Sequence, residues 1–420
     1  MTDSARTVLA GLDRIRDDIE DLYKDLHRNP ELGLEEHRTA GKAAELLRGL
    51  GCRVVEGIGG TGVVGVLTNG DGPTVMVRAD MDGLPVREQT GLPYASTVTT
   101  TGRDGTEQPV MHACGHDVHI ASLIGCVRLL AESEDSWKGT FVALLQPSEE
   151  PGDGADAMVA DGLTDKAPRP DVVLAQHVLN YPAGYVGTRA GSFMSAADSL
   201  RITVHGRGGH GAMPQTAVDP VVMAAMIVVR LQTIVSREIA ALTPVVVTVG
   251  SIHAGTGPNI IPDRAVMQVN VRTYDDATRT HVLQAIERIV KAECQASGAP
   301  KPPEFEKIVS FPPTVNDAGT TRRVAEAFAG HFGSDAHTID LQTASEDMSR
   351  IPEAFGVPFT YWGIGGGAPA PDEGEGADGS AAAPRPGNHS PYFAPVLQPT
   401  LDTGVSALVV ASLAWLAVEA

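Results

Sequence analysis

Four runs of almost uninterrupted apolar residues constrain this chain more than any other feature of its sequence. The runs GVVGVLT, TVMVRAD, TFVALLQ and DVVLAQHV lie between residues 62 and 178, among helical stretches such as HIASLIGCVRLLAES. A strand that is apolar on both sides belongs in a sheet that is covered on both faces, because neither side can be left in water. The mixture with helices predicts an α/β fold with a layered, mostly parallel central sheet.

A second pattern occupies residues 192–309. The elements there follow the order strand, helix, strand, strand, helix, and a strand near FEKIVSF closes the series. This order is typical of a small α+β, ferredoxin-like unit with two helices on one face of its sheet. We therefore expect a second, smaller domain in the middle of the chain.

The flanking segments carry weaker signals. Residues 5–49 predict two helices with a break at Asn29-Pro30, the first of them amphipathic. After the second unit, TTRRVAEAFAGHF predicts a helix, FTYWGIGG a strand, and residues 399–419 a last helix. Residues 368–387 are rich in Gly, Pro, Ala and acidic residues, which indicates a flexible loop.

Charge and length exclude several classes of protein. The 420 residues carry a formal net charge of −20, and the average field of such a chain repels nucleic acids and anionic membranes. The longest uncharged apolar stretches, 221–229 and 405–418, are shorter than the ~20 residues of a membrane span. The N-terminus lacks the apolar segment of a signal peptide, and four cysteines are too few for a disulfide scaffold. We expect a soluble, cytoplasmic protein with no nucleic-acid or membrane partner.

Metal-binding side chains concentrate in two short segments. MHACGHDVH places Cys114 and His116 two residues apart, and thiolate and imidazole are good zinc ligands. Glu149 and Glu150 follow an apolar strand in QPSEEPGDG, in a turn where both carboxylates can approach one site. A solvated surface pair is the simpler interpretation of adjacent glutamates, but open α/β sheets bind ligands at the carboxyl ends of their strands.

A third, scattered set also lies just past apolar strands. Asp80 and Asp82 end TVMVRADMD, His177 ends DVVLAQHV, and His389 stands in NHSP after the flexible loop. A lone histidine is usually structural, but three acid or histidine groups placed just past apolar strands are harder to dismiss, and they indicate a common site.

Two glycine-rich stretches raise a remote alternative, a nicotinamide-dependent oxidoreductase. GIGGTG at 57–62 follows a strand, but strand and turn residues come next where a dinucleotide site requires a helix. GRGGHG at 206–211 lies between a strand and a helix, yet no acidic residue lies near the required spacing of about twenty positions, and the nearest to it is Glu238, 27 after Gly211. The sequence has no G-x-S-x-G motif, so a hydrolase with a serine nucleophile elbow has no support.

Together, these segments resemble the M20 family of metallopeptidases and amidohydrolases. The resemblance is strongest to the branch that holds hippurate hydrolases, N-acyl-amino-acid amidohydrolases and auxin-conjugate hydrolases. It runs from LHRNPELGLEEHRTA to NHSPYFAPV through the motifs RADMDGLPV, MHACGHDVH, QPSEEPGDGA, QHV, GRGGHGAMP, GTGPNIIPD and SEDM. The order of the motifs is specific to the family and much less specific to a substrate.

The resemblance implies two divalent metal ions in each subunit, with zinc expected and manganese or cobalt as alternatives. The implied ligands are Cys114, His116, Glu150, His177 and His389. Glu149 would be the general base, and Asp82 would orient a ligand. The roles of Asp80, His112 and His119 stay open.

The position of the ligands in the sequence also divides the chain. His389 must join ligands from 114–177, so residues 1–191 and 310–420 would form one discontinuous catalytic domain. Residues 192–309 would be an inserted lid, and the resemblance implies a homodimer through it. From this insert His210 would take part in catalysis, in its own subunit or the partner's, and Asn259 and Arg272 would bind substrate. A surface salt bridge is the alternative role for Arg272.

The implied activity is hydrolysis of the amide bond of small-molecule N-acyl amino acids, to a carboxylic acid and a free amino acid. A metallo-dipeptidase or carboxypeptidase of the same family is the alternative. A catalytically inactive binding protein would be expected to lack Glu149 or a ligand, and all of them are present.

Overall fold

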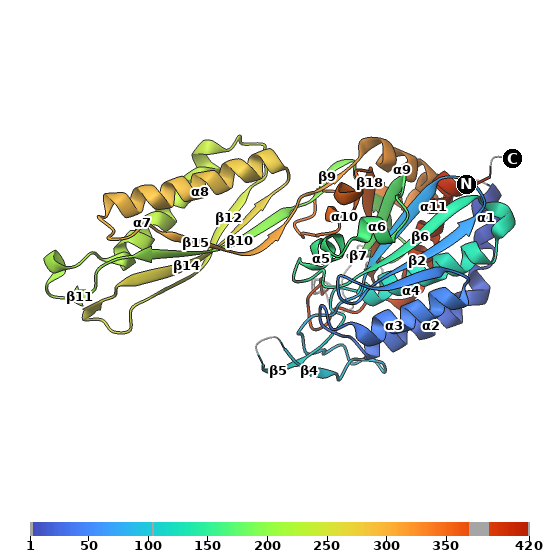
Figure 1. The fold of residues 1–420 in the computed structure, drawn as a ribbon, viewed down its shortest axis with the longest axis horizontal. Coiled ribbons are helices and arrows are strands. Elements are labelled where there is room, and N and C mark those ends of the chain that lie inside the picture. The colour runs from blue at the N-terminus through green and yellow to red at the C-terminus, as the bar shows by residue number, and fades with distance from the viewer. Residues whose placement is uncertain (1–2, 103–104, 369–385, 419–420) are drawn as a thin grey trace, which may run out of the picture. The chain divides into compact units, whose positions relative to one another are not determined.

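A computed structural model of the chain describes residues 3–102, 105–368 and 386–418 (Figure 1). Most of the predicted flexible loop, residues 369–385, lies outside the described residues. The chain divides into two compact units. Unit 1 consists of residues 1–191, 316–340 and 347–420, and unit 2 of residues 192–315 and 341–346. The predicted end of the insert, residue 309, falls inside strand β15 (Glu304–Phe311).

An eight-stranded sheet forms the centre of unit 1. Its strands follow the order β1 (Arg53–Ile58), β2 (Gly62–Asn69), β6 (Gly139–Gln146), β3 (Thr74–Asp80), β7 (Val172–Pro182), β18 (Phe359–Gly367), β8 (Val186–Thr188) and β17 (Ala336–Thr338). The four strands β6, β3, β7 and β18 run parallel to one another. The predicted α/β fold with a mostly parallel central sheet is confirmed.

Helices cover both faces of this sheet (Figure 1). Helix α4 (His116–Ala131) is buried along almost its whole length and packs against α11 (Leu397–Leu416) and strand β3. Such burial is expected for a helix that is apolar all round. The remaining helices of unit 1 are α1 (Asp3–Leu9), α2 (Leu12–Arg28), α3 (His37–Gly49), α5 (Gly154–Ala160), α6 (Leu163–Lys166), α9 (Ala318–Phe332) and α10 (Arg350–Phe355).

The prediction of two helices over residues 5–49 was wrong. The structure has three, because α1 and α2 are separated at Ala10 and Gly11. A Cβ atom at Gly11 would lie 2.9 Å from Cδ2 of Leu129, so the chain makes a close approach to α4 at this point. The apolar periodicity continues across the break and therefore hid it.

Unit 2 contains a four-stranded antiparallel sheet in the order β12 (Val246–Ala254), β14 (Arg264–Thr273), β10 (Ala196–His205) and β15. Helices α7 (Pro220–Thr233) and α8 (Asp276–Ala296) pack on one face of it (Figure 1). Their apolar faces and the inward side of β14 form a separate hydrophobic core. The predicted element order of this unit is confirmed.

The shortest elements were not predicted. They are β4 (Thr99–Thr101), β5 (Glu107–Pro109), β9 (Gly191–Met194), β11 (Gly209–His210), β13 (Ile260–Ile261) and β16 (Thr314–Asn316), together with β8, β17, α5, α6 and α10. Elements of a few residues carry too little periodicity to be recognised.

Both glycine-rich stretches lie in turns that lack the helix of a dinucleotide site. Residues 57–62 join the antiparallel strands β1 and β2. Residues 206–211 contain the short strand β11 (Gly209–His210), and α7 begins only at Pro220. This arrangement does not favour the oxidoreductase alternative.

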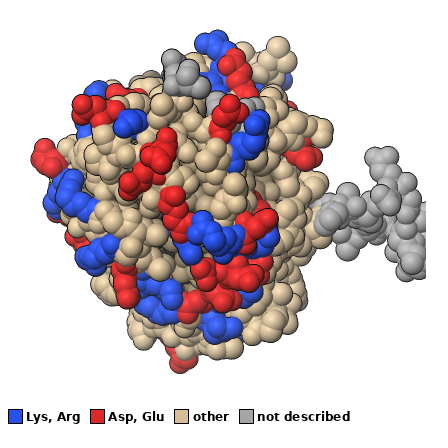
Figure 2. Space-filling model, turned by 90° about the vertical axis from the view of Figure 1, so that its right-hand side faces the viewer, with Lys and Arg blue, Asp and Glu red and all other residues tan. Residues whose placement is uncertain are grey.

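Two helices, α11 and the segment Pro220–Glu238, are long and apolar enough to cross a membrane by length and composition. The uncharged runs within them are shorter than a membrane span, so the sequence pattern did not indicate this. Helix α11 is mostly buried inside unit 1, as a core helix is. On the face in Figure 2, Lys and Arg side chains lie among Asp and Glu side chains. Surface ion pairs such as Arg128–Asp18, at 2.6 Å, form in this unit.

Candidate metal centre

The candidate site lies at one edge of the unit 1 sheet. Strands β6, β3 and β7 are neighbours and run parallel, so their carboxyl ends meet at this edge. Glu149 follows β6 and Asp82 follows β3. His177 lies in the middle of β7, just past Ala175, the last residue of β7 that pairs with β3. The predicted site residues of unit 1 are therefore brought together by the topology of the sheet.

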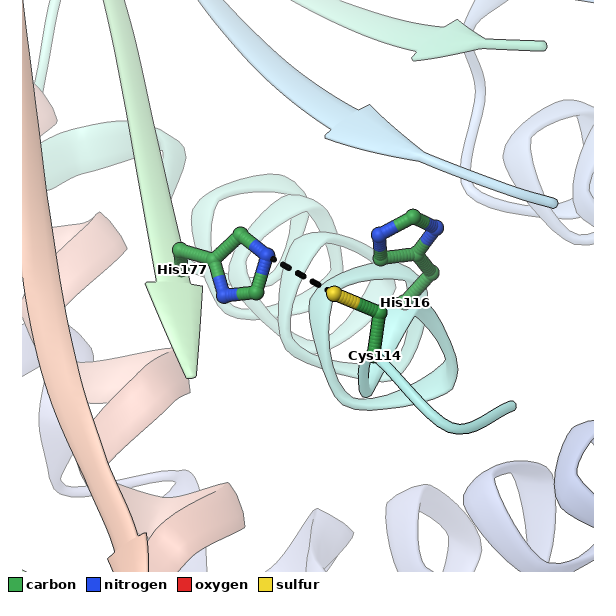
Figure 3. A group of neighbouring side chains, drawn as sticks. All are labelled: Cys114, His116 and His177. Carbon is green, nitrogen blue, oxygen red and sulfur yellow. Dashed lines mark hydrogen bonds between the residues drawn. The ribbon is translucent and has the colours of Figure 1, made fainter. Parts of the chain in front are cut away.

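Cys114 and His116 reach the same edge from the turn that begins α4 (Figure 3). Gly115, between them, has φ +84, and a Cβ atom there would lie 2.3 Å from Cγ1 of Val178. Only glycine fits this turn without displacing Val178. The turn places the Cys114 sulfur 3.4 Å from Nε2 of His177 (Figure 3).

Backbone carbonyls orient both imidazoles. The ring nitrogen Nδ1 of His116 lies 2.9 Å from the carbonyl oxygen of Asp82, and Nδ1 of His177 lies 2.8 Å from that of Val178. A carbonyl can only accept, so each Nδ1 carries a proton, and Nε2 has a free lone pair when the ring is neutral. This is the tautomer in which a histidine binds a metal through Nε2.

Carboxylates approach the free nitrogen of His116. An oxygen of Glu149 and an oxygen of Glu150 each lie 3.9 Å from its Nε2. Asp82 accepts a hydrogen bond from the backbone N–H of Glu150 at 2.9 Å, and its carbonyl oxygen accepts one from Nδ1 of His116. Asp82 therefore contacts both the His116 ring and the backbone of Glu150. Nε2 of His116 and Oε1 of Glu150 are buried and have no hydrogen-bond partner among the described residues. A cation bound between them would satisfy both atoms.

His389 is held at the site although it is distant in the sequence. Its Nε2 lies 3.3 Å from Oε2 of Glu150, and its backbone N–H donates to the carbonyl of Ala113 at 2.7 Å. The neighbouring Asn388 donates from Nδ2 to the carbonyls of Cys114 and Val178. Asn388 was not predicted as a site residue, although it directly precedes His389 in NHSP.

The five predicted ligands fit a two-metal site. Ligand atoms of Cys114, His116 and His177 all lie within 4.8 Å of one another, and so do those of Cys114, Glu150 and His389. Because Cys114 belongs to both groups, its sulfur atom is within reach of a metal ion in either of them. Thiolate, imidazole and carboxylate together are typical ligands of zinc and neighbouring transition metals.

The electrostatics of these groups favour a bound cation. Burial, and then the charges of Glu150 and Glu149, raise the pKa of the Cys114 thiol well above its usual value. A thiolate at this position therefore needs compensating positive charge. Burial lowers the pKa of His177, which keeps the ring neutral and able to act as a ligand.

His119 and Asp80 form a buried connection beside the ligands. Nδ1 of His119 donates to Asp80 at 2.5 Å, and Nε2 accepts from the backbone N–H of Val178 at 2.9 Å. Arg78 donates to the other oxygen of Asp80 at 2.6 Å. Both nitrogens of His119 are occupied, so it supports the site and has no nitrogen left for a metal.

His112 is buried with no partner for either nitrogen among the described residues, and burial lowers its pKa to about 4.

The remaining predicted site residues belong to unit 2. His210 is exposed on β11, and its Nδ1 accepts from the N–H of Ala212 at 3.1 Å. Asn259 lies beside it, because its carbonyl accepts from the N–H of Gly211 at 2.8 Å. The structure thus brings His210 and Asn259 together at one end of unit 2.

Arg272, on β14, is half-buried. It donates to Oδ1 of Asn270 at 3.0 Å and to the hydroxyl of Ser345 at 2.6 Å. Within the described parts of the chain no carboxylate forms a salt bridge with it, which argues against the alternative of a surface ion pair. Its guanidinium keeps donors for an added carboxylate.

We expect Cys114 to react with an alkylating reagent slowly in the metal-loaded protein and faster after chelation. A metal-bound sulfur cannot react with the reagent. After chelation Cys114 is a thiol, whose raised pKa slows alkylation but no longer blocks it. The rate is measured by mass spectrometry of the peptide. Cys126, which is buried in α4, is the control, and its rate should not depend on metal. Equal rates at Cys114 with and without metal would make it a structural cysteine.

Comparison with known proteins gives a family match over most of the chain. The model of Peptidase family M20/M25/M40 matches residues 76–378. A hippurate hydrolase of Campylobacter jejuni is 38% identical over 355 residues, which cover 83% of this chain and 88% of that protein. Thermostable carboxypeptidase 1 of Saccharolobus solfataricus is 36% identical over 356 residues, which cover 84% of this chain and 86% of that protein.

A solved structure is similar over both units. It is a Bacillus subtilis protein described as a dinuclear metal-binding peptidase from the M20 family. The TM-score is 0.74 at 26% sequence identity, with 96% of this chain and 99% of that chain covered.

Proposed function

Because the chain belongs to the M20/M25/M40 peptidase family and is a metal-dependent amide hydrolase, we propose that it cleaves N-acyl amino acids to a carboxylic acid and a free amino acid. The observation that carries this proposal is the pair of ligand groups that share Cys114, with Glu149 beside them. The similarity to a hippurate hydrolase supports an N-acyl amino acid as substrate. The similarity to a carboxypeptidase supports a second candidate, removal of a C-terminal residue from a short peptide.

In the proposed site Cys114, His116, Glu150, His177 and His389 hold two divalent cations, with zinc preferred and manganese or cobalt as alternatives. Bound cations of this kind act as Lewis acids on an amide carbonyl and lower the pKa of a water molecule. Glu149, which adjoins the ligand Glu150, takes a proton from the attacking water and delivers it to the leaving nitrogen. Asp82 holds the His116 ring and the backbone of Glu150 in place.

Three residues of unit 2 have proposed roles toward the substrate. Nε2 of the exposed His210 would donate a hydrogen bond to the oxyanion, and Asn259, which lies beside it, would bind the substrate. Arg272 would hold the carboxylate of the amino-acid part, since a planar guanidinium binds a carboxylate through two hydrogen bonds. Each role rests on the family resemblance together with the surroundings described above.

Unit 2 would act as a lid and as the interface of a homodimer in the cytoplasm. Val222, Met226 and Val229 are 58%, 51% and 66% exposed and lie at helical spacing on α7. Strand β12 is an edge strand of the sheet beside this helix. An exposed apolar stripe next to an unpaired strand edge is suited to a second copy of the same surface.

A substrate screen tests the proposal. The panel contains N-acetyl, N-benzoyl and long-chain N-acyl amino acids, and beside them dipeptides and N-blocked dipeptides, with free amino acid as the readout. We expect release from at least one class of N-acyl amino acid. Release only from the peptides would support the carboxypeptidase candidate, and no release from any compound would contradict amide hydrolysis.

A further inference from the structure

Glu36 is a buried carboxylate that the catalytic proposal does not use. It is fully buried, and its Oε1 accepts the backbone N–H of Ser148 at 2.8 Å, 112 positions away in the sequence. Its Oε2 accepts the hydroxyl of Thr61 at 2.5 Å. Burial is the largest cause that raises the pKa of Glu36, to about 7. A buried carboxylate is costly, so its two donors indicate a specific role.

Ser148 has an unusual backbone conformation directly before Glu149 and Glu150. Its φ is +52, in the left-handed region that residues with a side chain rarely adopt. Three contacts hold it there. Glu36 accepts its N–H, its hydroxyl donates to Asp153 at 2.5 Å, and its carbonyl accepts the N–H of Gly154 at 3.1 Å. Strained backbone of this kind persists only where its surroundings impose it.

Gly33, in the same N-terminal segment as Glu36, also lies close to Ser148. A Cβ atom at Gly33 would lie 2.5 Å from the Ser148 hydroxyl oxygen and 3.0 Å from its Cα. The segment from Gly33 to Glu36 therefore packs directly against the turn, and it does so independently of the Glu36 hydrogen bond.

We propose that Glu36 is a positioning residue that, through its hydrogen bond to the Ser148 N–H, fixes the turn that places Glu149 beside the attacking water. The inference rests on the proposed function, because it takes Glu149 as the base. Glu36 acts through the backbone of Ser148, and Thr61 fixes the Glu36 carboxylate in turn. A displacement of about 1 Å in such a group can cost ~10²-fold in rate.

The test compares two substitutions of Glu36. Glu36→Gln keeps an oxygen that can accept the Ser148 N–H, whereas Glu36→Met has a similar length and no acceptor. Glu35→Met is the matched control, since the Glu35 side chain makes no hydrogen bond among the described residues. The measurements are kcat and KM for an N-acyl amino acid, and hydrogen exchange of the backbone amides in the 147–154 segment, other than Pro147 and Pro151, in the metal-free protein.

We expect Glu36→Met to lower kcat by ~10- to 10²-fold with little change in KM, and to speed amide exchange in the 147–154 segment. Glu36→Gln should restore most of both properties, and Glu35→Met should match the wild type. A folded Glu36→Met protein with normal kcat and exchange overturns the inference. Equal losses of kcat in the Glu36→Gln and Glu36→Met proteins also overturn it. The enzyme would then depend on the negative charge of Glu36, and not on an acceptor for the Ser148 N–H.

If Glu36→Met does not fold, Thr61→Val decides, because it removes only the hydroxyl that holds the Glu36 carboxylate. Faster exchange and lower kcat support the inference, and unchanged values overturn it. Glu149→Gln in the same assay separates this result from the proposed function. If that protein is inactive while the Glu36 and Thr61 variants behave as wild type, only the positioning role fails.

Discussion

Substitution of Glu149 by glutamine is expected to lower kcat by at least ~10²-fold, the usual contribution of a general base. Glutamine has the shape of glutamate but cannot take a proton from water. Glu149 lies next to the ligand Glu150, with one oxygen 3.9 Å from Nε2 of His116. Steady-state kinetics and metal analysis of the same preparation measure the effect, and metal content should stay near that of the wild type.

Glu150→Gln is the matched control for Glu149→Gln. Its side chain contacts His389 at 3.3 Å and belongs to the ligand group that contains Cys114. We expect Glu150→Gln to lose bound metal together with activity. A Glu149→Gln enzyme that turned over at a near-normal rate would remove Glu149 as the base.

Replacement of His210 by alanine is expected to leave metal binding unchanged and to lower kcat by ~10²- to 10³-fold, the usual cost of losing one oxyanion donor. His210 is exposed on β11 of unit 2, and its Nδ1 already accepts the N–H of Ala212. Only Nε2 is therefore left to donate to a substrate. The loss should appear mainly in kcat, because the interaction is made in the transition state.

A mixture of two inactive variants shows which subunit supplies His210. If His210 acts across the dimer, a dimer of one His210→Ala chain and one Glu149→Gln chain has one site with both groups intact. Under random exchange half of the dimers are mixed, so up to about a quarter of wild-type activity should return. No recovery, with subunit exchange confirmed by native mass spectrometry, would exclude the arrangement in trans.

The sequence predicted those parts of the fold that follow from long patterns. The apolar runs of β2, β3, β6 and β7 were long enough to identify a sheet buried on both faces. Parallel strands then explain why Asp82, Glu149 and His177, far apart in the sequence, lie at one edge. The motif MHACGHDVH pointed to metal chemistry because cysteine and histidine are strong ligands.

Contacts between distant residues could not be predicted. The hydrogen bond from His119 to Asp80 joins residues 39 positions apart, and the contact of Glu36 with Ser148 spans 112. Such contacts depend on how the helices pack on the sheet, and no local pattern records them. For the same reason Asn388 was overlooked beside His389, although both hold the C-terminal segment to the site.

The central claim, a hydrolase that depends on two metal ions held by Cys114 and its neighbours, is tested most directly by metal removal and return. The protein is dialysed against a strong chelator, and amino-acid release and bound metal are measured while Zn²⁺, Mn²⁺ or Co²⁺ is added back. We expect hydrolysis of an N-acyl amino acid to stop in the metal-free protein and to return as bound metal approaches two ions per chain. Hydrolysis that continues at the full rate in protein shown to be metal-free would contradict the claim.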